Sequence, residues 1–160
     1  MTGLRITELR TADLSAVTRI HAESFDDAWS ASMLRRILSM PGAEGIVARN
    51  GAGDDIAGFA LSRIAGGESE LLSLAVDPAQ RRRGIGRRLL LAAIESAARG
   101  RASVLFLEVA EDNAAARQLY DQHGFTPVGR RPDYYRMKDG TTVAALTMRR
   151  DLDRVAAESR

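Results

Sequence analysis

The chain has 160 residues, of which 45% are hydrophobic, and this is enough for one domain with a continuous core. Its 23 basic residues against 21 acidic residues leave a formal net charge of +2, which argues against a general nucleic-acid binder. There is no cysteine, which excludes disulfides, thiolate metal sites and a cysteine nucleophile.

Residues 1–150 are predicted to form a single domain followed by a tail over residues 151–160. Two histidines, His21 and His123, are too few for a usual zinc site, so we expect no metal. No stretch approaches the roughly 18 consecutive apolar residues of a membrane span, so we expect no membrane partner and a cytoplasmic protein.

The N-terminal half predicts a strand, two helices and a β-hairpin. Alternation and helical spacing of apolar residues assign these elements, in order, to residues 4–10, 11–25, 30–40 and 45–64. Thr11 or Asp13 is expected to start the first helix, and Ser30 to cap the second. Gly51 lies in the expected hairpin turn.

The C-terminal half predicts four more strands and two helices. The strands are expected at residues 68–76, 103–109, 125–130 and 141–150, and the helices at 84–100 and 113–124. Residues 103–109 are almost all apolar, which is typical of a central strand covered on both faces. Asn113 is the expected N-cap of the last helix, and Gly124 its C-terminal stop. The result is a mixed α/β sheet with helices on both faces.

An arginine-rich turn with two glycines, "RRRGIGRR" at residues 81–88, opens the helix at 84–100. A Rossmann fingerprint needs a third glycine where Leu89 stands, and a Walker loop needs a Gly-Lys-Ser/Thr ending that is absent. Gly84 and Gly86 would let unpaired helix N-terminal amides approach an anion, and phosphate suits such a site. The added positive charge would come from Arg82, Arg83 and Arg87. The alternatives are a charged turn that only solvates the helix start, and a nucleic-acid patch. The patch is disfavoured because aromatic residues make up only 5% of the chain.

The stretch "LLSLAVDPAQRRRGIGRRLL" resembles the acetyl-CoA signature of the GNAT N-acetyltransferase superfamily. This resemblance implies the GNAT fold, a mixed and mostly antiparallel central sheet of about seven strands with helices on both faces. It also implies acetyl-CoA as cosubstrate. The cofactor-binding residues that it implies are Leu74, Ala75, Val76, Arg81, Arg82, Arg83, Gly84, Ile85, Gly86, Arg87 and Asn113.

The later stretch "LFLEVAEDNAAARQLYDQHGFTPVGRRPDYY" is similar to the bacterial ribosomal-protein-alanine acetyltransferase branch of that superfamily. By this resemblance Glu108 is the general base and Tyr120 the general acid toward the leaving thiolate. The alternatives are an ion pair with an arginine for Glu108 and core packing for Tyr120. Candidate walls of the acceptor channel are Trp29, Tyr134 and Tyr135, with ordinary packing as the alternative for Trp29. Three positions depart from the branch and bear on the acceptor: Ala28, Ala110 and Val143.

The expected activity is direct acetyl transfer from acetyl-CoA to the N-terminal amine of a protein, with a ribosomal protein beginning in alanine as the implied acceptor. An α-amine titrates near pH 7.7–8.0 and lysine near 10.4, so an N-terminal amine needs less help from a base. The alternatives are acetylation of a small-molecule amine and an acetyl-CoA-binding module without catalysis. We expect no nucleic-acid partner, and a monomer or weak dimer.

Overall fold

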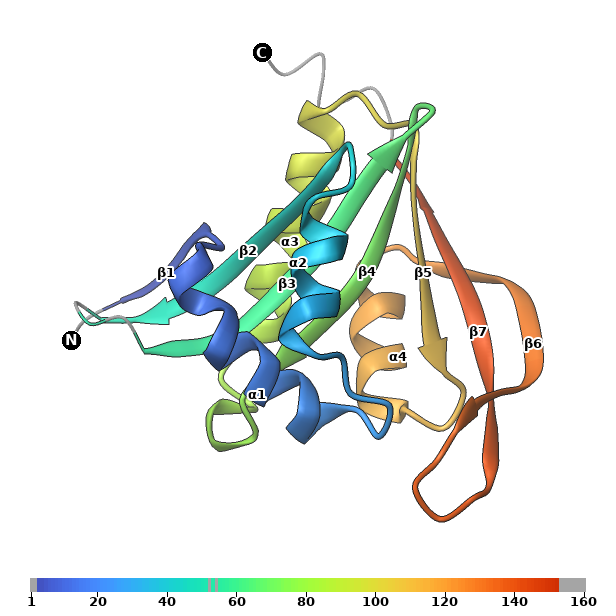
Figure 1. Ribbon diagram of the computed structural model, residues 1–160. Helices are drawn as coiled ribbons and strands as arrows, with labels where there is room; N and C mark the ends of the chain where they lie inside the picture. Colours follow the sequence, from blue (N-terminus) through green and yellow to red (C-terminus); the bar gives the residue numbers. More distant parts are fainter. Residues whose placement is uncertain (1–2, 52, 54, 153–160) are drawn as a thin grey trace.

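The chain folds around one sheet of seven strands in the order β1-β2-β3-β4-β5-β7-β6. The computed structural model describes residues 3–152 except 52 and 54 (Figure 1). Neighbouring strands are antiparallel except for the parallel pair β4 and β5, which confirms the expected mixed, mostly antiparallel sheet. The strands are β1 Leu4–Glu8, β2 Ala43–Asn50, β3 Ile56–Ala65, β4 Glu68–Val76, β5 Val104–Ala110, β6 Thr126–Arg136 and β7 Thr142–Asp151.

Helices cover both faces of the sheet, as the sequence predicts. The helices are α1 Leu14–Ser24, α2 Ala31–Leu38, α3 Ile85–Arg99 and α4 Ala114–Gln122, with short 3-10 turns at Thr11–Asp13 and Pro78–Gln80. Helices α1 and α2 lie over one face of β2–β4, and α3 and α4 lie behind the opposite face (Figure 1). Ser30 caps α2 by accepting a hydrogen bond from the Met33 amide at 3.1 Å, so this expectation is confirmed.

The larger apolar core lies between the sheet and the helices α3 and α4. Leu89 and Leu90 of α3 are fully buried there, and each such side chain stabilises the fold by about 1.5–3 kcal/mol. Gly58 of β3 permits this close packing. A Cβ at that position would lie 2.8 Å from the carbonyl oxygen of Ala75 and 3.0 Å from Leu89 Cδ1.

Strands β4 and β5 separate toward their carboxyl ends (Figure 1). Their pairing runs only from Ser69 opposite Leu105 to Leu71 opposite Leu107. In the described part of the chain the remainder of β4 pairs with β3 alone. The two strand ends are therefore apart where the signature turn begins.

Strand β5 corrects one expectation. Leu105, Leu107 and Val109 are buried beneath α3 and α4, whereas Phe106 and Glu108 on the other face are only half-buried. Helices α1 and α2 lie over β2–β4, so the strand is not covered on both faces as predicted.

The C-terminal hairpin is longer than the sequence indicates. Strand β6 continues past residue 130 to Arg136, with register shifts that begin at Pro127 and Arg131. Strand β7 continues to Asp151, and the Leu152 amide donates to the carbonyl of Ser103 at 2.9 Å. Asp151, assigned to the tail, therefore extends the sheet, and Leu152 hydrogen-bonds next to it. The rest of that predicted tail lies outside the described residues.

Candidate functional site

The turn before α3 presents backbone amides to solvent. Gly84 is the N-cap and has a left-handed backbone with φ of 78°, which glycine adopts at little cost. The Arg88 amide bonds to the Gly84 carbonyl, and within the described residues the amides of Ile85, Gly86 and Arg87 have no acceptor. These amides form the partially positive end of the helix, which favours an anion. This backbone arrangement is the one that the predicted anion cradle requires, and anion binding there stays a prediction.

The arginines of this turn are all exposed but differ in their partners. Arg81 donates from Nε to the carbonyl of Val76 and from a terminal nitrogen to Ser24 Oγ, both at 3.1 Å. Arg81 therefore ties the turn to β4 and α1. Arg83 bonds to the side chain of Gln80 at 3.1 Å, whereas the exposed Arg82 and Arg87 make no side-chain hydrogen bond to the described residues. The side chain of Ile85 is buried in the core, so only its amide is available to a ligand.

The end of β4 packs directly against the start of α3. Leu74 and Val76 are half-buried and Ala75 is buried. A Cβ at Gly86 would lie 3.7 Å from the Val76 side chain and 4.0 Å from that of Leu74. After β5, Asn113 Oδ1 accepts a hydrogen bond from the Ala116 amide at 3.2 Å, which confirms Asn113 as the cap of α4. The predicted cofactor residues thus gather at the carboxyl ends of β4 and β5.

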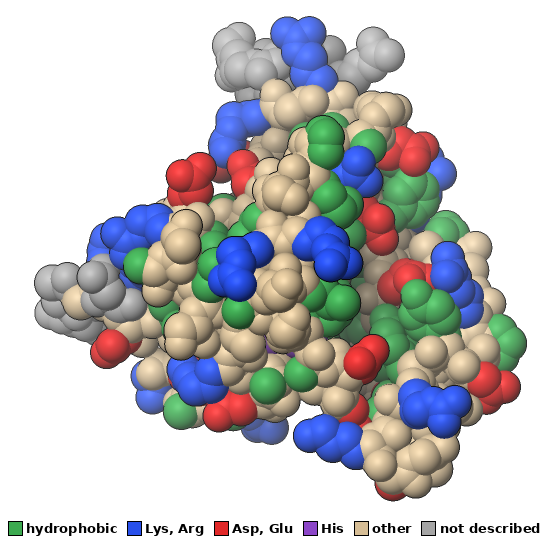
Figure 2. Space-filling view, in the orientation of Figure 1, with side chains coloured by type: hydrophobic (Ala, Val, Ile, Leu, Met, Phe, Trp, Pro, Cys, Tyr) green, Lys and Arg blue, Asp and Glu red, His purple; other side chains and the backbone are tan. Residues whose placement is uncertain are grey.

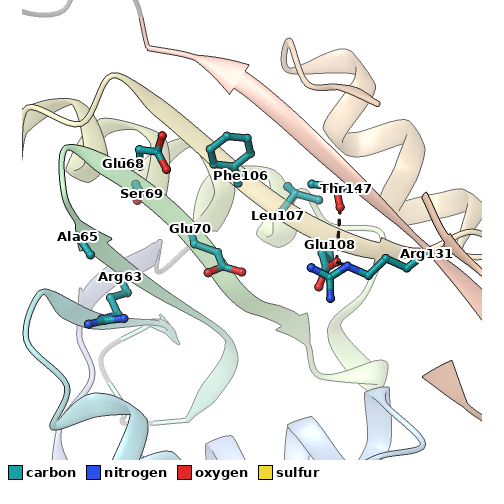
Figure 3. A pocket seen from close by; sticks show the side chains of 10 residues that line it. All are labelled: Arg63, Ala65, Glu68, Ser69, Glu70, Phe106, Leu107, Glu108, Arg131 and Thr147. Carbon is teal, nitrogen blue, oxygen red and sulfur yellow. Dashed lines mark hydrogen bonds and ion pairs between the residues drawn. The ribbon is translucent and has the colours of Figure 1, made fainter. Parts of the chain in front are cut away.

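Glu108 lies in a pocket of about 330 Å³ on the face of β5 that no helix covers in the described part of the chain. Figure 2 shows a hollow on this face, and Figure 3 shows Glu108 and Arg131 meeting within the pocket. Arg131 Nε is 3.1 Å from Glu108 Oε2, and Thr147 Oγ1 donates to the same oxygen at 3.4 Å. The Glu108 side chain is 21% exposed, so it can reach a ligand. The ion pair expected as the alternative is therefore present, in a position compatible with catalysis.

A second carboxylate, Glu70 of β4, lines the same pocket, and sequence reasoning missed it. Partial desolvation and the charge of Glu108 raise the pKa of Glu70, against the lowering effect of Arg131 and Arg63. In the sequence Glu70 is one polar residue in an alternating strand. Only the parallel register, which sets it opposite Phe106, places it on the same face as Glu108.

Tyr120 lies within the larger core. Its side chain is 6% exposed and packs edge-on against Phe125, with ring centroids 5.7 Å apart. Burial, with a smaller effect of Tyr135, raises the pKa of Tyr120 to about 12. The hydroxyl therefore keeps its proton at neutral pH, so core packing and a hydrogen-bond donor role are compatible.

The candidate acceptor aromatics lie on two segments that touch. Trp29, between α1 and α2, stacks on His21 with ring centroids 4.6 Å apart, and its amide donates to His21 Nδ1 at 3.1 Å. Tyr134 and Tyr135 of β6 meet edge to face at 5.1 Å. The Lys138 amide, beyond β6, donates to an Asp26 carboxylate oxygen at 3.0 Å and so joins the two segments.

Acid should destabilise the fold through His21. Burial, opposed by the charge of Asp27, lowers the pKa of His21 from 6.5 to about 4. Between these values the unfolded chain binds more protons, so the free energy of unfolding falls as the pH drops. From pH 7 to pH 5 this group should account for a loss of about 2 kcal/mol. Denaturant unfolding of the wild type and His21→Gln at both pH values measures it, and equal losses in both proteins would contradict this origin.

The described residues contain neither a cluster of metal ligands nor a helix suited to a membrane. Among residues 3–51, 53 and 55–152 no three His, Asp or Glu side chains are grouped as metal ligands would be. No described helix has the length and apolar character needed to cross a membrane.

Known proteins resemble the chain over nearly its whole length. Residues 14–125 match the acetyltransferase (GNAT) family. The chain is 39% identical over 152 residues to the N-alpha-acetyltransferase RimI of Mycobacterium tuberculosis, with 91% of each chain covered. The crystal structure of the ribosomal-protein-S18-alanine N-acetyltransferase from Escherichia coli superposes with a TM-score of 0.86 at 30% identity, covering 94% of this chain and 95% of that one.

A more distant structure, yncA from Salmonella typhimurium solved with its cofactor acetyl-CoA, has a TM-score of 0.78 at 24% identity and covers 94% of both chains. At that identity it shows the shared fold alone. The resemblance to the superfamily, and to its ribosomal-protein-alanine branch, is confirmed by these relatives. The signature turn and the separated strands β4 and β5 agree with the family match. This chain belongs to the GNAT family of acetyltransferases, because residues 14–125 match that family.

Proposed function

We propose that this protein transfers the acetyl group of acetyl-CoA directly to the N-terminal α-amine of a protein, with the N-terminal alanine of a ribosomal protein as the acceptor. The observation that carries the proposal is the position of Glu108, in an open pocket beside the point where β4 and β5 separate. The names of the M. tuberculosis and E. coli relatives support the acceptor class. The proposal places the protein in the cytoplasm, as a monomer or weak dimer.

The residues present fit acetyl-CoA. The unpaired amides before α3 and the exposed Arg82 and Arg87 would hold its phosphates. Leu74, Ala75 and Val76 would lie beside its pantetheine arm. When bound, the cofactor supplies an acyl group activated as a thioester.

Two side chains of this protein would move protons during transfer. Glu108 would accept a proton from the acceptor ammonium, directly or through water, so that the nitrogen lone pair becomes free to attack. Tyr120 would donate its hydroxyl proton toward the departing sulfur. With no cysteine in the chain, a cysteine acyl-enzyme is excluded, which supports direct transfer.

Removing Arg82 and Arg87, two of the exposed arginines of the turn, should weaken cofactor binding. Because phosphate contacts by arginine are charge-assisted, Arg82→Ala with Arg87→Ala should raise the KM for acetyl-CoA about tenfold or more. Steady-state kinetics with varied acetyl-CoA measures this. The matched control replaces Arg35 and Arg36, two exposed arginines of α2, with alanine. An equal rise in KM in the control would mean that net charge, and not the turn, is responsible.

The acceptor is tested by mass spectrometry of one pooled reaction. The pool contains the protein, acetyl-CoA, a ribosomal peptide with a free N-terminal alanine, an N-terminally blocked lysine peptide and common small amines. Acetylation of the alanine nitrogen alone is expected. Acetylation of a small amine alone would overturn the ribosomal acceptor but leave the acetyltransferase standing. No acetylation despite bound acetyl-CoA would favour the non-catalytic module.

A further inference from the structure

Glu70 and Glu108 project into one pocket from neighbouring strands. Glu70 is opposite Phe106 in the parallel register, and Glu108 follows two residues later on the same face of β5. Figure 3 shows both carboxylates within the pocket, with the Glu70 side chain directed along its floor toward Glu108. Beyond the effect of partial burial, the negative charge of Glu108 raises the pKa of Glu70, so the two carboxylates interact. Within this pocket, which Glu68 also lines, Glu70 and Glu108 therefore repel each other.

Arg63 and Arg131 both line this pocket, and Arg131 is the cation that contacts Glu108. It makes one ion pair with Glu108 through Nε at 3.1 Å, and its charge also acts on Glu70. The Arg131 side chain is 60% exposed and its guanidinium lies over the Tyr134 ring, 5.2 Å from the centroid. Both contacts of this exposed arginine are weak, because an exposed ion pair contributes about 0–1 kcal/mol and an exposed cation–π contact about 0.5–1 kcal/mol. It can move aside for another cation.

We propose that Glu70 is a specificity-determining residue, which together with Glu108 binds the ammonium form of the acceptor in the place that the Arg131 guanidinium holds when no acceptor is bound. The inference rests on the proposed function, because it needs an amine acceptor at Glu108. Glu70 lies outside the acetyl-CoA signature stretch.

The ammonium form is the one that reaches the pocket at neutral pH. An α-amine with a pKa near 7.7–8.0 is mostly charged at pH 7, and a pair of carboxylates attracts it more strongly than one. Once Glu108 takes the proton, the amine is neutral and the attraction to Glu70 weakens. When the neutral nitrogen attacks the thioester carbonyl it becomes positively charged again, so Glu70 stabilises the bound ammonium and the transition state alike. Its removal should therefore raise KM and leave kcat nearly unchanged.

Steady-state kinetics of Glu70→Gln tests the inference with the amine that the wild type acetylates in the pooled reaction. The KM for that amine should rise about tenfold with little change in kcat. Arg131→Gln should lower the KM for the amine, since it removes the guanidinium that competes with the acceptor ammonium. The control is Glu95→Gln, an exposed carboxylate on α3 at the far side of the sheet, and its kinetics should match the wild type.

Two results would overturn the inference while the acetyltransferase stands: an unchanged KM in Glu70→Gln, or a fall in kcat at constant KM. Calorimetric titration of the alanine-initiated peptide into the protein with CoA supplies a readout that needs no turnover. Weaker binding by Glu70→Gln is expected there, and equal binding by the wild type and variant would contradict the inference. A wild type that acetylates no amine would count against the proposed function, whatever the titration shows for Glu70.

Discussion

Replacing Glu108 with glutamine should lower turnover by about 10²-fold or more while the affinity for acetyl-CoA stays unchanged. Glutamine keeps the shape of the side chain and its contact with Thr147, but it cannot accept a proton from the acceptor amine. Glu108 also lies apart from the turn before α3, so the cofactor site is not altered. Steady-state kinetics and calorimetric titration with acetyl-CoA measure the two quantities.

The control for this variant is Glu95→Gln, which neutralises one exposed carboxylate outside the pocket. A Glu108→Gln enzyme with near wild-type turnover would show that the ion pair with Arg131 is only structural. Raising the pH gives an independent check. More acceptor is then uncharged, so the gap between wild type and variant should narrow toward alkaline pH if Glu108 acts as the base.

Replacing Asp13 with asparagine should lower the free energy of unfolding by about 3–5 kcal/mol. Asp13 and Arg49 are 4% and 2% exposed, and an Arg49 terminal nitrogen donates to Asp13 Oδ1 at 3.0 Å. Burial alone would raise the pKa of Asp13. Hydrogen bonds from the Arg49 side chain and the Arg10 amide, together with the positive charges of both side chains, hold this pKa below its usual value. Asparagine would leave the Arg49 charge buried without its carboxylate. Denaturant unfolding at pH 7 measures the loss.

Two further variants show whether the loss comes from removal of the Asp13 charge beside Arg49. The double variant Asp13→Leu with Arg49→Met removes both charges and should cost less than Asp13→Asn alone. Arg99→Met breaks an exposed pair with Glu95, whose side chains are 63% and 71% exposed, and should cost about 0–1 kcal/mol. An additive, larger loss in the double variant would show that packing, and not charge, dominates at this site.

Features that depend on a few consecutive residues could be predicted from the sequence alone. Helix α3 could be predicted from its apolar pattern, to which Leu89 and Leu90 belong, and its glycine N-cap from the signature turn. The cap at Asn113 was also predictable, because a side chain that bonds to an amide three residues later requires no distant partner. The family signature likewise lies in one continuous stretch, so the cofactor class could be predicted with it.

Features that depend on strand register came only from the tertiary structure. Glu70 lies near Glu108 because β4 and β5 pair in parallel for a short distance and then separate, and no local pattern encodes that register. Arg131 reaches the pocket because β6 extends past its predicted end. The buried pair of Asp13 and Arg49 joins residues 36 apart in sequence. The sequence alone thus determined the helices, the caps and the signature turn, which arise from local interactions. The tertiary structure decided which charges meet, since those contacts depend on how distant strands pair.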